Sequence, residues 1–275
     1  MNQPKPYQVA RRTLRFTGPV PSLLQGVASG GPLYVHARNW MAELASIVPL
    51  SGMVIDEDEK TAFFPEEGLH LSLSAVEAVH GVEIDYRSRQ ALALEIATHG
   101  EPRSLSVVAI PNISEMEHFT HSLNHHPADI LMEEEYQQWR DEFIIRPVIC
   151  PCCKAAADER RAFPERNPLT RIFCHAIEQQ MEIRCSLVSP VIGFTTWLRP
   201  KDLQLSNGIL GAIAEDGKSM LEVDFGICHT LRIVCRLYDD EPFTEICLYD
   251  SVGTLHFKLA ARGWDKDAIW RGMCM

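Results

Sequence analysis

The amino-acid sequence predicts an α+β protein built as a tandem duplication, in which each repeat is a large antiparallel sheet with helices packed at one end. A strand–turn–strand pattern occurs twice, at residues 91–108 and at residues 231–249. Both hairpins carry Glu-Pro at the predicted corner, where the fixed φ and missing N–H of proline suit a turn. A helical pattern precedes each hairpin, so the two segments read as copies of one unit.

The predicted elements follow one another in a regular order. The expected domains are an N-terminal arm (1–32), a first repeat (33–128), a segment with a helix and a Cys-containing linker (129–168), and a second repeat (169–275). The arm contains a short helix near Leu23. The first repeat has a strand at 33–37, a helix at 40–47 that Asn39 caps, a hairpin at 53–64, a strand from 69 that becomes a short helix, the first hairpin, and a helix capped by Ser114. A helix at 129–143, the linker from 150 to 168, a helix at 170–180 and then strands complete the chain.

Composition excludes several classes of protein. The chain has 275 residues, 46% hydrophobic and 23% charged, which is ordinary globular usage and is enough for one large domain or two smaller ones. A net charge of −11 would repel phosphate backbones, and Lys and Arg do not cluster. We therefore expect no nucleic-acid partner.

Hydropathy and cysteine usage predict the cellular compartment. No run approaches 18 consecutive apolar residues, and the N-terminus lacks the pattern of a secretory leader. The nine cysteines are an odd number, and none precedes Cys150, which is unlike a disulfide framework. We expect a soluble cytoplasmic protein with reduced thiols and no membrane partner.

Four segments carry a resemblance to a known family. Residues 35–39 read Val-His-Ala-Arg-Asn, residues 70–81 form an apolar run that ends in His-Gly, residues 169–197 combine a helix and a strand, and residues 245–271 contain a Tyr-Asp-Ser-Val-Gly turn. In order and spacing these segments resemble the cytoplasmic haem-utilisation proteins of Gram-negative bacteria, which include haem carriers and haemin-degrading proteins. The resemblance spans most of residues 33–271.

The resemblance implies a fold and a ligand. It implies two pseudo-symmetric halves and a haem cleft between sheet and helices. It also implies an axial histidine from the helical segment after the first repeat, and an arginine that faces it from an Asp-Leu-Arg-Leu-Phe strand. Ser72 stands at the position of that arginine, and His70 at the position of the aspartate. A hydroxyl cannot replace a guanidinium, so the loss of this arginine counts against haem degradation more than against haem binding.

Histidines and arginines supply the candidate haem ligands. His118, His121, His125 and His126 lie close together, and helical spacing places the first three on one face. His121, His125 and His126 are the candidates for the axial ligand of haem or a related planar macrocycle. Solvated surface histidines are the alternative. Arg38 and Arg199 are the candidates for the propionates, although Arg38 could instead anchor a strand.

A Cys-Pro-Cys-Cys segment offers a second chemistry. Cys150, Cys152 and Cys153 place three thiols within four residues. Thiolates suit zinc, and a Cys-Pro pair also suits haem iron. No second Cys-x-x-Cys completes a tetrahedral zinc site, so free linker thiols are the alternative.

The leading functional hypothesis is a cytoplasmic haem-binding protein of haem and iron utilisation, acting in carriage or in degradation. The alternative is a non-catalytic regulatory or protein-interaction module on the same scaffold that has lost the haem site. Ser72 favours this alternative. Association as a homodimer, or with another protein, is left open by the sequence.

Overall fold

The computed structural model describes residues 13–50, 52–56, 60–65, 68–86, 89–110, 113–114, 116–143 and 150–274. Residues 1–12 of the predicted arm and residues 144–149, between the predicted helix at 129–143 and the predicted linker, lie outside this part of the chain. Two compact units make up the chain. The first comprises Met1–Ala37, Ile47–Arg146 and Pro190–Ile192, and the second comprises Arg38–Ser46, Pro147–Ser189 and Gly193–Met275. The predicted domain boundaries at residues 32, 128 and 168 stay predictions.

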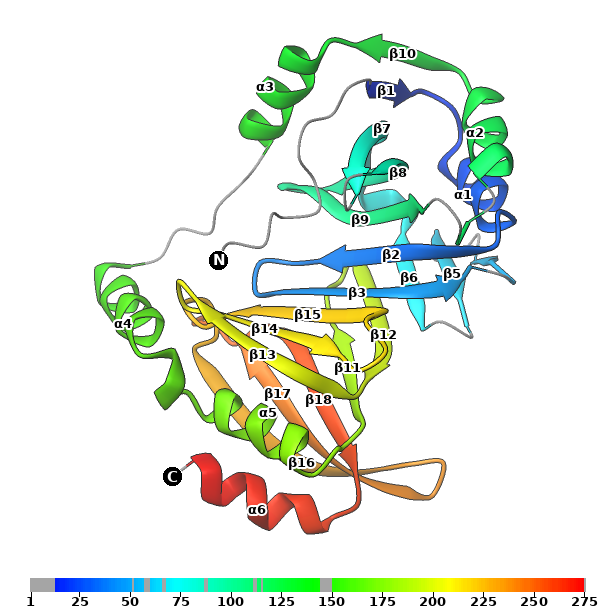
Figure 1. Cartoon of the computed structure of the whole chain (residues 1–275). Coiled ribbons are helices and arrows are strands. Elements are labelled where there is room, and N and C mark those ends of the chain that lie inside the picture. Colours follow the sequence, from blue (N-terminus) through cyan, green and yellow to red (C-terminus); the bar gives the residue numbers. More distant parts are fainter. Residues whose placement is uncertain are drawn as a thin grey trace. The chain divides into compact units, whose positions relative to one another are not determined.

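The first unit is built on antiparallel ladders (Figure 1). One ladder has the order β10-β1-β7-β8-β9-β2, and a shorter one has the order β6-β5-β4. The helix α1 packs on α2, and α3 lies on β9. The elements are β1 (Thr13–Phe16), α1 (Val20–Ala28), β2 (Pro32–Arg38), β4 (Val54–Asp56), β5 (Thr61–Phe64), β6 (Leu69–Ser72), a 3-10 turn (Leu73–Ala75), β7 (Val76–Tyr86), β8 (Arg89–Thr98), β9 (Glu101–Ala109), α2 (Met116–Asn124), β10 (Ala128–Leu131) and α3 (Glu133–Phe143).

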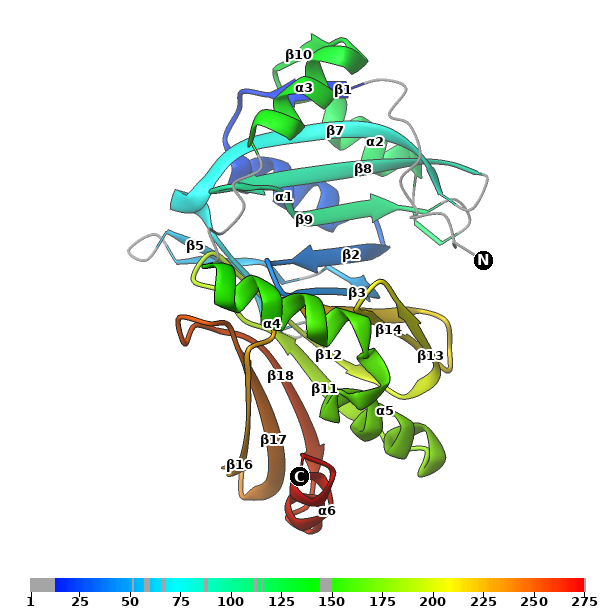
Figure 2. The same ribbon diagram turned by 90° about the vertical axis from the view of Figure 1, so that its left-hand side faces the viewer.

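The second unit has two further antiparallel ladders, in the orders β16-β17-β18-β11-β12 and β3-β15-β14-β13. Figure 2 shows α4 leading into α5 through a short turn. The apolar face of α5 packs on β13 and on α6. The elements are β3 (Ala42–Pro49), α4 (Pro151–Ala162), a 3-10 turn (Pro164–Arg166), α5 (Pro168–Glu178), β11 (Ile183–Leu187), β12 (Ile192–Leu198), β13 (Pro200–Ser206), β14 (Ile209–Ala214), β15 (Ser219–Asp224), β16 (Thr230–Tyr238), β17 (Glu241–Tyr249), β18 (Leu255–Arg262) and α6 (Asp265–Cys274).

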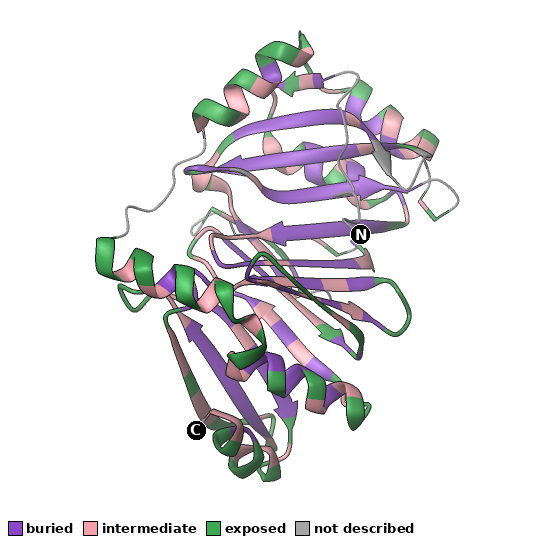
Figure 3. Cartoon of the chain, turned by 60° about the vertical axis from the view of Figure 1, so that its left-hand side comes forward, coloured by how far each residue is buried: buried purple, intermediate pink, exposed green. Residues whose placement is uncertain are grey.

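The order of elements repeats along the chain. A helix, eight strands and a helix run from α1 through β2–β9 to α2, and again from α5 through β11–β18 to α6. The ladder β7-β8-β9-β2 of the first unit corresponds to β16-β17-β18-β11 of the second. The predicted α+β class, with duplicated antiparallel sheets, is confirmed. Figure 3 shows the strands as mostly buried and the helices as exposed on their outer faces.

The two predicted hairpins are present, but they are not equivalent copies. The first is β8–β9 and the second is β16–β17, whereas the repeated order makes β8 the counterpart of β17. The Glu-Pro pairs also lie beyond the corners, because Glu101 and Glu241 begin the returning strands. Asp239 and Asp240 make the second turn with φ of 49° and 63°, both in the left-handed region that tight hairpin turns require.

Three predicted elements need correction. Residues 42–49 form β3 and not a helix, because the side chain of Asn39 closes a turn into a strand that pairs with β15. The start of the predicted helix at 129–143 is the strand β10. The predicted linker holds a helix of its own, α4. The predicted arm contains α1 as expected, but α1 buries Leu23 and Leu24 and is not loosely packed.

Candidate functional site

The histidine-bearing helix α2 is held against α1 by close packing. A Cβ on Gly26 would lie 3.2 Å from the Cβ of Ser122, so only glycine allows this approach without a shift. The carbonyl of Gly26 accepts a hydrogen bond from Ser122 Oγ at 2.9 Å and lies 3.2 Å from His118 Nε2. His118 Nε2 also lies 2.7 Å from Ser29 Oγ. His118 therefore ties the two helices together.

His121 on α2 and His125 in the turn directly after α2 form an exposed pair. Their ring centroids lie 3.9 Å apart, as helical i,i+4 spacing predicts. His125 Nδ1 lies 2.8 Å from the carbonyl oxygen of His121. A carbonyl oxygen can only accept, so Nδ1 carries a proton in this contact. Nε2 has no hydrogen-bond partner among the described residues, so it is the ring nitrogen that could bind a metal.

His126 lies elsewhere, at the end of α2 and against α1. A Cβ on Gly18 would lie 3.7 Å from its Nδ1, and a Cβ on Gly26 would lie 4.0 Å from its Nε2. His126 is half-buried, whereas His121 and His125 are exposed. The structure thus brings together two of the three predicted axial candidates and places the third beside α1.

The two predicted propionate partners, Arg38 and Arg199, both belong to the second unit. Arg38 Nη1 lies 3.4 Å from Glu43 Oε1, and the two side chains are 27% and 22% exposed. Arg199 Nη1 lies 3.8 Å from Glu215 Oε2, and both of these side chains are about half exposed or more. Each arginine therefore already has a carboxylate partner.

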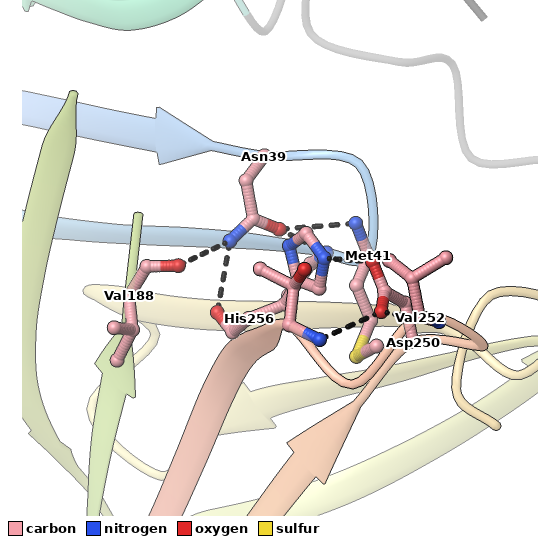
Figure 4. Close-up of polar contacts among 8 residues, drawn as sticks. Asn39, Met41, Val188, Asp250, Val252 and His256 are labelled. Carbon is pink, nitrogen blue, oxygen red and sulfur yellow. Dashed lines mark hydrogen bonds and ion pairs between the residues drawn. The ribbon is translucent and has the colours of Figure 1, made fainter. Parts of the chain in front are cut away.

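Asn39, next to Arg38, has a structural role that the sequence suggested only in part. Its Oδ1 accepts from the backbone N–H groups of Met41 and Ala42, each at 3.0 Å. Its Nδ2 donates to the carbonyls of Val188 at 3.1 Å and His256 at 2.8 Å (Figure 4). All four hydrogen-bonding positions of the amide are used. Asn39 thus joins the turn before β3 to the end of β11 and to β18.

A pair formed by the buried His256 and the half-buried Asp250 lies beside this amide. His256 Nε2 lies 2.9 Å from Asp250 Oδ2 (Figure 4). Burial acts to raise the pKa of Asp250, but the hydrogen bonds from His256 and from the N–H groups of Thr254 and Val252 hold that pKa below its usual value. The pair orders the turn between β17 and β18.

The three thiols of the Cys-Pro-Cys-Cys segment lie together at the start of α4. Their sulfur atoms are within 4.8 Å of one another, and Cys150 Sγ lies 2.8 Å from Cys152 Sγ. Cys150 is the N-cap, and its sulfur accepts from the N–H of Cys153 at 3.4 Å. Hydrogen bonds from the Cys152 thiol and then from this N–H lower the pKa of Cys150 to about 7. The hydrogen bond to Cys150 raises the pKa of Cys153 to about 11.

One buried polar group escaped the sequence analysis. His80 on β7 is 0% exposed, and neither ring nitrogen has a hydrogen-bond partner in the described part of the chain. Its ring lies 4.3 Å from that of Trp139 and 5.2 Å from that of Tyr136, both on α3. Burial, with a smaller contribution from Arg15, lowers the pKa of His80 to about 4. The sequence held no sign that α3 would cover this strand.

Comparison with solved structures finds the same fold elsewhere. The chain is similar to holo-PhuS, a haem-binding protein from Pseudomonas aeruginosa, with a TM-score of 0.69 and 13% identity over 96% of this chain and 86% of that one. It is also similar to the haem-degrading enzyme ChuS of Escherichia coli O157:H7, with a TM-score of 0.67 and 14% identity over 96% and 86% of the two chains. A second structure of ChuS, an E. coli haem oxygenase, has a TM-score of 0.67 and 15% identity over 96% of this chain and 88% of that one.

The likeness to PhuS and ChuS is one of fold, with only 13–15% sequence identity. No protein-family model matches the chain, and no curated protein sequence matches it. The fold that the resemblance implied is therefore confirmed over nearly the whole chain. No helix among the described residues is long and apolar enough to cross a membrane.

Proposed function

We propose that this chain is a divergent haem-utilisation protein that binds haem through His125 and serves haem and iron utilisation in the cytoplasm. Its fold is that of a haem-binding protein and of a haem-degrading enzyme, over 96% of its length. A shared fold does not carry a function by itself. The proposal therefore depends on the chemistry of the pair His121 and His125 at the end of α2.

The orientation of His125 is the observation that carries the proposal. Histidines that bind metals commonly donate the second ring N–H to a carbonyl or carboxylate, which fixes the tautomer and makes the free nitrogen a better ligand. His125 donates from Nδ1 to the carbonyl of His121 at 2.8 Å, and its exposed Nε2 has no hydrogen-bond partner in the part of the chain that the structure describes. Bound haem would supply a ferric centre that accepts this nitrogen.

Carriage is favoured over degradation by what stands at position 72. Ser72 Oγ lies 3.0 Å from Ser74 Oγ, and its short side chain offers no cation from that strand. The propionate roles of Arg38 and Arg199 stay predictions. A propionate that bound either arginine would compete with Glu43 or Glu215.

The test is an absorbance titration of the purified protein with ferric haem, following the Soret band. We expect a saturable shift at one haem per chain. His125→Ala should weaken binding by more than about 100-fold and change the spectrum, because even outer partners of metal-bound histidines contribute roughly 10–100-fold.

Two matched variants sharpen the result. His121→Ala retains the backbone carbonyl that orients His125, so we expect it to bind haem nearly as well as the native chain. His229→Ala removes another exposed histidine, next to Thr230, and should change nothing. Equal losses in His125→Ala and His229→Ala would reject His125 as the ligand.

The alternative function is a regulatory or protein-interaction module that has kept the scaffold without the haem site. Ser72, where the resembling family has arginine, is the observation in its favour. A native chain whose titration matches that of a non-binding control protein would support this alternative and end the haem proposal.

A further inference from the structure

The haem proposal leaves the thiols of α4 unexplained. Among the residues that the structure describes, these three form the one group of His, Cys, Asp or Glu side chains close enough to share a metal ion. Cys150 and Cys152 are exposed and Cys153 is half-buried, so the sulfur atoms are open to solvent. Core cysteines such as Cys185 are closed off from solvent, and burial raises the pKa of the Cys185 thiol.

The local sequence explains why the three sulfurs converge. Pro151 at the first helical position has the fixed φ that starts a helix. Cys150 then becomes the N-cap, with an extended backbone at φ −65° and ψ 157°, and its side chain folds back over the first turn. Cys152 and Cys153 occupy that first turn. The cluster is thus a product of the cap and does not depend on distant segments.

The far end of α4 is fixed to its own unit. Arg161 makes two hydrogen bonds to Asp224, at 2.9 and 3.2 Å, and Arg160 donates to the carbonyls of Phe225 and Gly226 at 2.8 and 2.9 Å. A Cβ on Gly226 would lie 2.2 Å from Arg161, so the glycine gives this side chain its room. The helix is anchored at its C-terminal end and presents its thiols at the other.

We propose that Cys150, Cys152 and Cys153 form a three-thiolate binding site for a thiophilic d10 cation, best matched by Cu(I). Thiolates select Cu(I) and zinc over hard cations such as magnesium. Cu(I) accepts three sulfur ligands in a trigonal arrangement, whereas protein zinc sites are almost always four-coordinate. The cluster offers three ligands, so zinc would need a fourth from solvent.

Metal uptake exchanges protons for the cation. Each thiol that carries a proton releases it to the buffer as its Cu–S bond forms. No electron is transferred, because the metal enters and stays as Cu(I).

The test uses the full-length chain, fully reduced and kept without oxygen, with Cu(I) supplied as its complex with the chromogenic chelator bicinchoninate. We expect one Cu(I) per chain to pass from the chelator to the protein. X-ray absorption at the copper edge should report three sulfur ligands. Cys150→Ser, Cys152→Ser and Cys153→Ser should each weaken retention of Cu(I) by more than about 100-fold, because a direct ligand contributes at least as much as its outer partners.

The controls separate metal binding from folding. Serine is a preferred N-cap, so Cys150→Ser should keep α4 intact by circular dichroism while losing the metal. Cys174→Ser and Cys235→Ser remove exposed thiols on α5 and β16 and should leave Cu(I) binding unchanged. Zinc should bind more weakly than Cu(I) in competition.

Three results would overturn the proposal. The first is a triple serine variant that retains Cu(I) as the native chain does. The second is a preference for zinc over Cu(I). The third is a disulfide between two of the thiols that persists in the reduced preparation and blocks metal uptake.

Discussion

Each unit buries one glutamate in the middle strand of a three-strand ladder, but the surroundings differ. Glu95 on β8 is 2% exposed and Glu245 on β17 is 3% exposed. Glu95 faces His80 on β7 and Ser106 on β9, and all three side chains are buried. Tyr136, on the separate helix α3, donates its hydroxyl hydrogen to Glu95. The first unit therefore buries a polar row beneath a helix.

The corresponding row in the second unit is apolar apart from its glutamate. Glu245 faces Val234 on β16 and Ala260 on β18. Its partners are Tyr238, which donates its hydroxyl hydrogen, and Arg236, whose Nε lies 2.9 Å away from Oε2. Both come from β16, and the side chain of Arg236 is 57% exposed. This glutamate keeps a partner in contact with solvent.

The difference teaches that one duplicated scaffold can satisfy the same buried carboxylate in two ways. In the first unit Arg103 of the neighbouring strand β9 lies 4.0 Å from Glu95, and Tyr136 comes from outside the ladder and closes the site. His80 is therefore desolvated, and its nitrogens have no described partner. In the second unit the neighbouring strand supplies both partners. We expect the first unit to be more sensitive to mutation and to acid.

The largest expected effect is the loss of the α3 cover. Tyr136→Ala should destabilise the protein by about 3–5 kcal/mol, because it leaves a cavity where a fully buried ring packs against His80. Tyr238→Ala, at a half-buried position, should cost about 1–2 kcal/mol. Urea unfolding followed by circular dichroism measures both. Equal losses would mean that α3 adds no special cover.

The second effect is a loss of stability between pH 6.5 and pH 4 that His80 gives to the first unit. The pKa of His80 is about 4 in the folded chain and 6.5 as the ordinary value, so between these values the unfolded chain binds a proton that the folded chain does not. Above pH 6.5 the titration of His80 therefore takes nothing from the free energy of unfolding. As the pH drops towards 4, that free energy falls by about 3 kcal/mol in total.

His80→Val tests this, since Val234 is the natural residue at the corresponding position beside Glu245. The variant should unfold like the native chain at pH 7 and should be more stable than it at pH 4, by about 3 kcal/mol. Other groups also titrate, so the measured quantity is the difference between the two unfolding curves. His229→Ala is the control for an exposed histidine. Parallel pH curves for His80→Val and the native chain would contradict the idea.

A smaller effect isolates the two hydroxyl groups. Tyr136→Phe keeps the ring and removes the donor to Glu95, which should cost about 1–3 kcal/mol because a buried carboxylate loses a partner. Tyr238→Phe should cost about 1 kcal/mol or less, because Glu245 retains Arg236 at 2.9 Å, whereas the arginine left to Glu95, Arg103, lies at 4.0 Å. Paired chemical denaturation of the two variants gives the difference. A larger loss in Tyr238→Phe would reverse the comparison.

The sequence predicted what depends on local pattern. The strand–turn–strand segments at 91–108 and 231–249 are hairpins, because alternating apolar residues and turn residues act over short range. The predicted helix with His121 is α2 for the same reason, and His125 lies in the turn directly after it. The sequence indicates that Asn39 is a capping residue. The same two hydrogen bonds, from the N–H groups of Met41 and Ala42, also close a turn that leads into a strand. An asparagine at this position therefore does not tell whether a helix or the strand β3 follows.

Long-range contacts could not be predicted. Nothing near His80 indicates that Tyr136, far along the chain, would cover it. One missed signal was local: Pro151 directly after Cys150 marks a helix start, with the cysteine as N-cap, inside the predicted linker. The pairing of Arg38 with Glu43 likewise needed the turn that Asn39 closes.

The smallest effect concerns the one exposed partner in the comparison. Arg236→Gln removes the ion pair with Glu245, and we expect a loss of about 1 kcal/mol that shrinks in high salt, since the arginine is 57% exposed and solvent screens its charge. Arg262→Gln is the matched control. Arg262 and Glu241 pair at 3.5 Å with both side chains exposed, so we expect this ion pair to contribute nothing measurable to the stability of the protein. Thermal unfolding at two salt concentrations separates them. If Arg236→Gln cost as much as Tyr136→Phe, the open side of β16 would be as desolvated as the face beneath α3, and the contrast between the two units would fail.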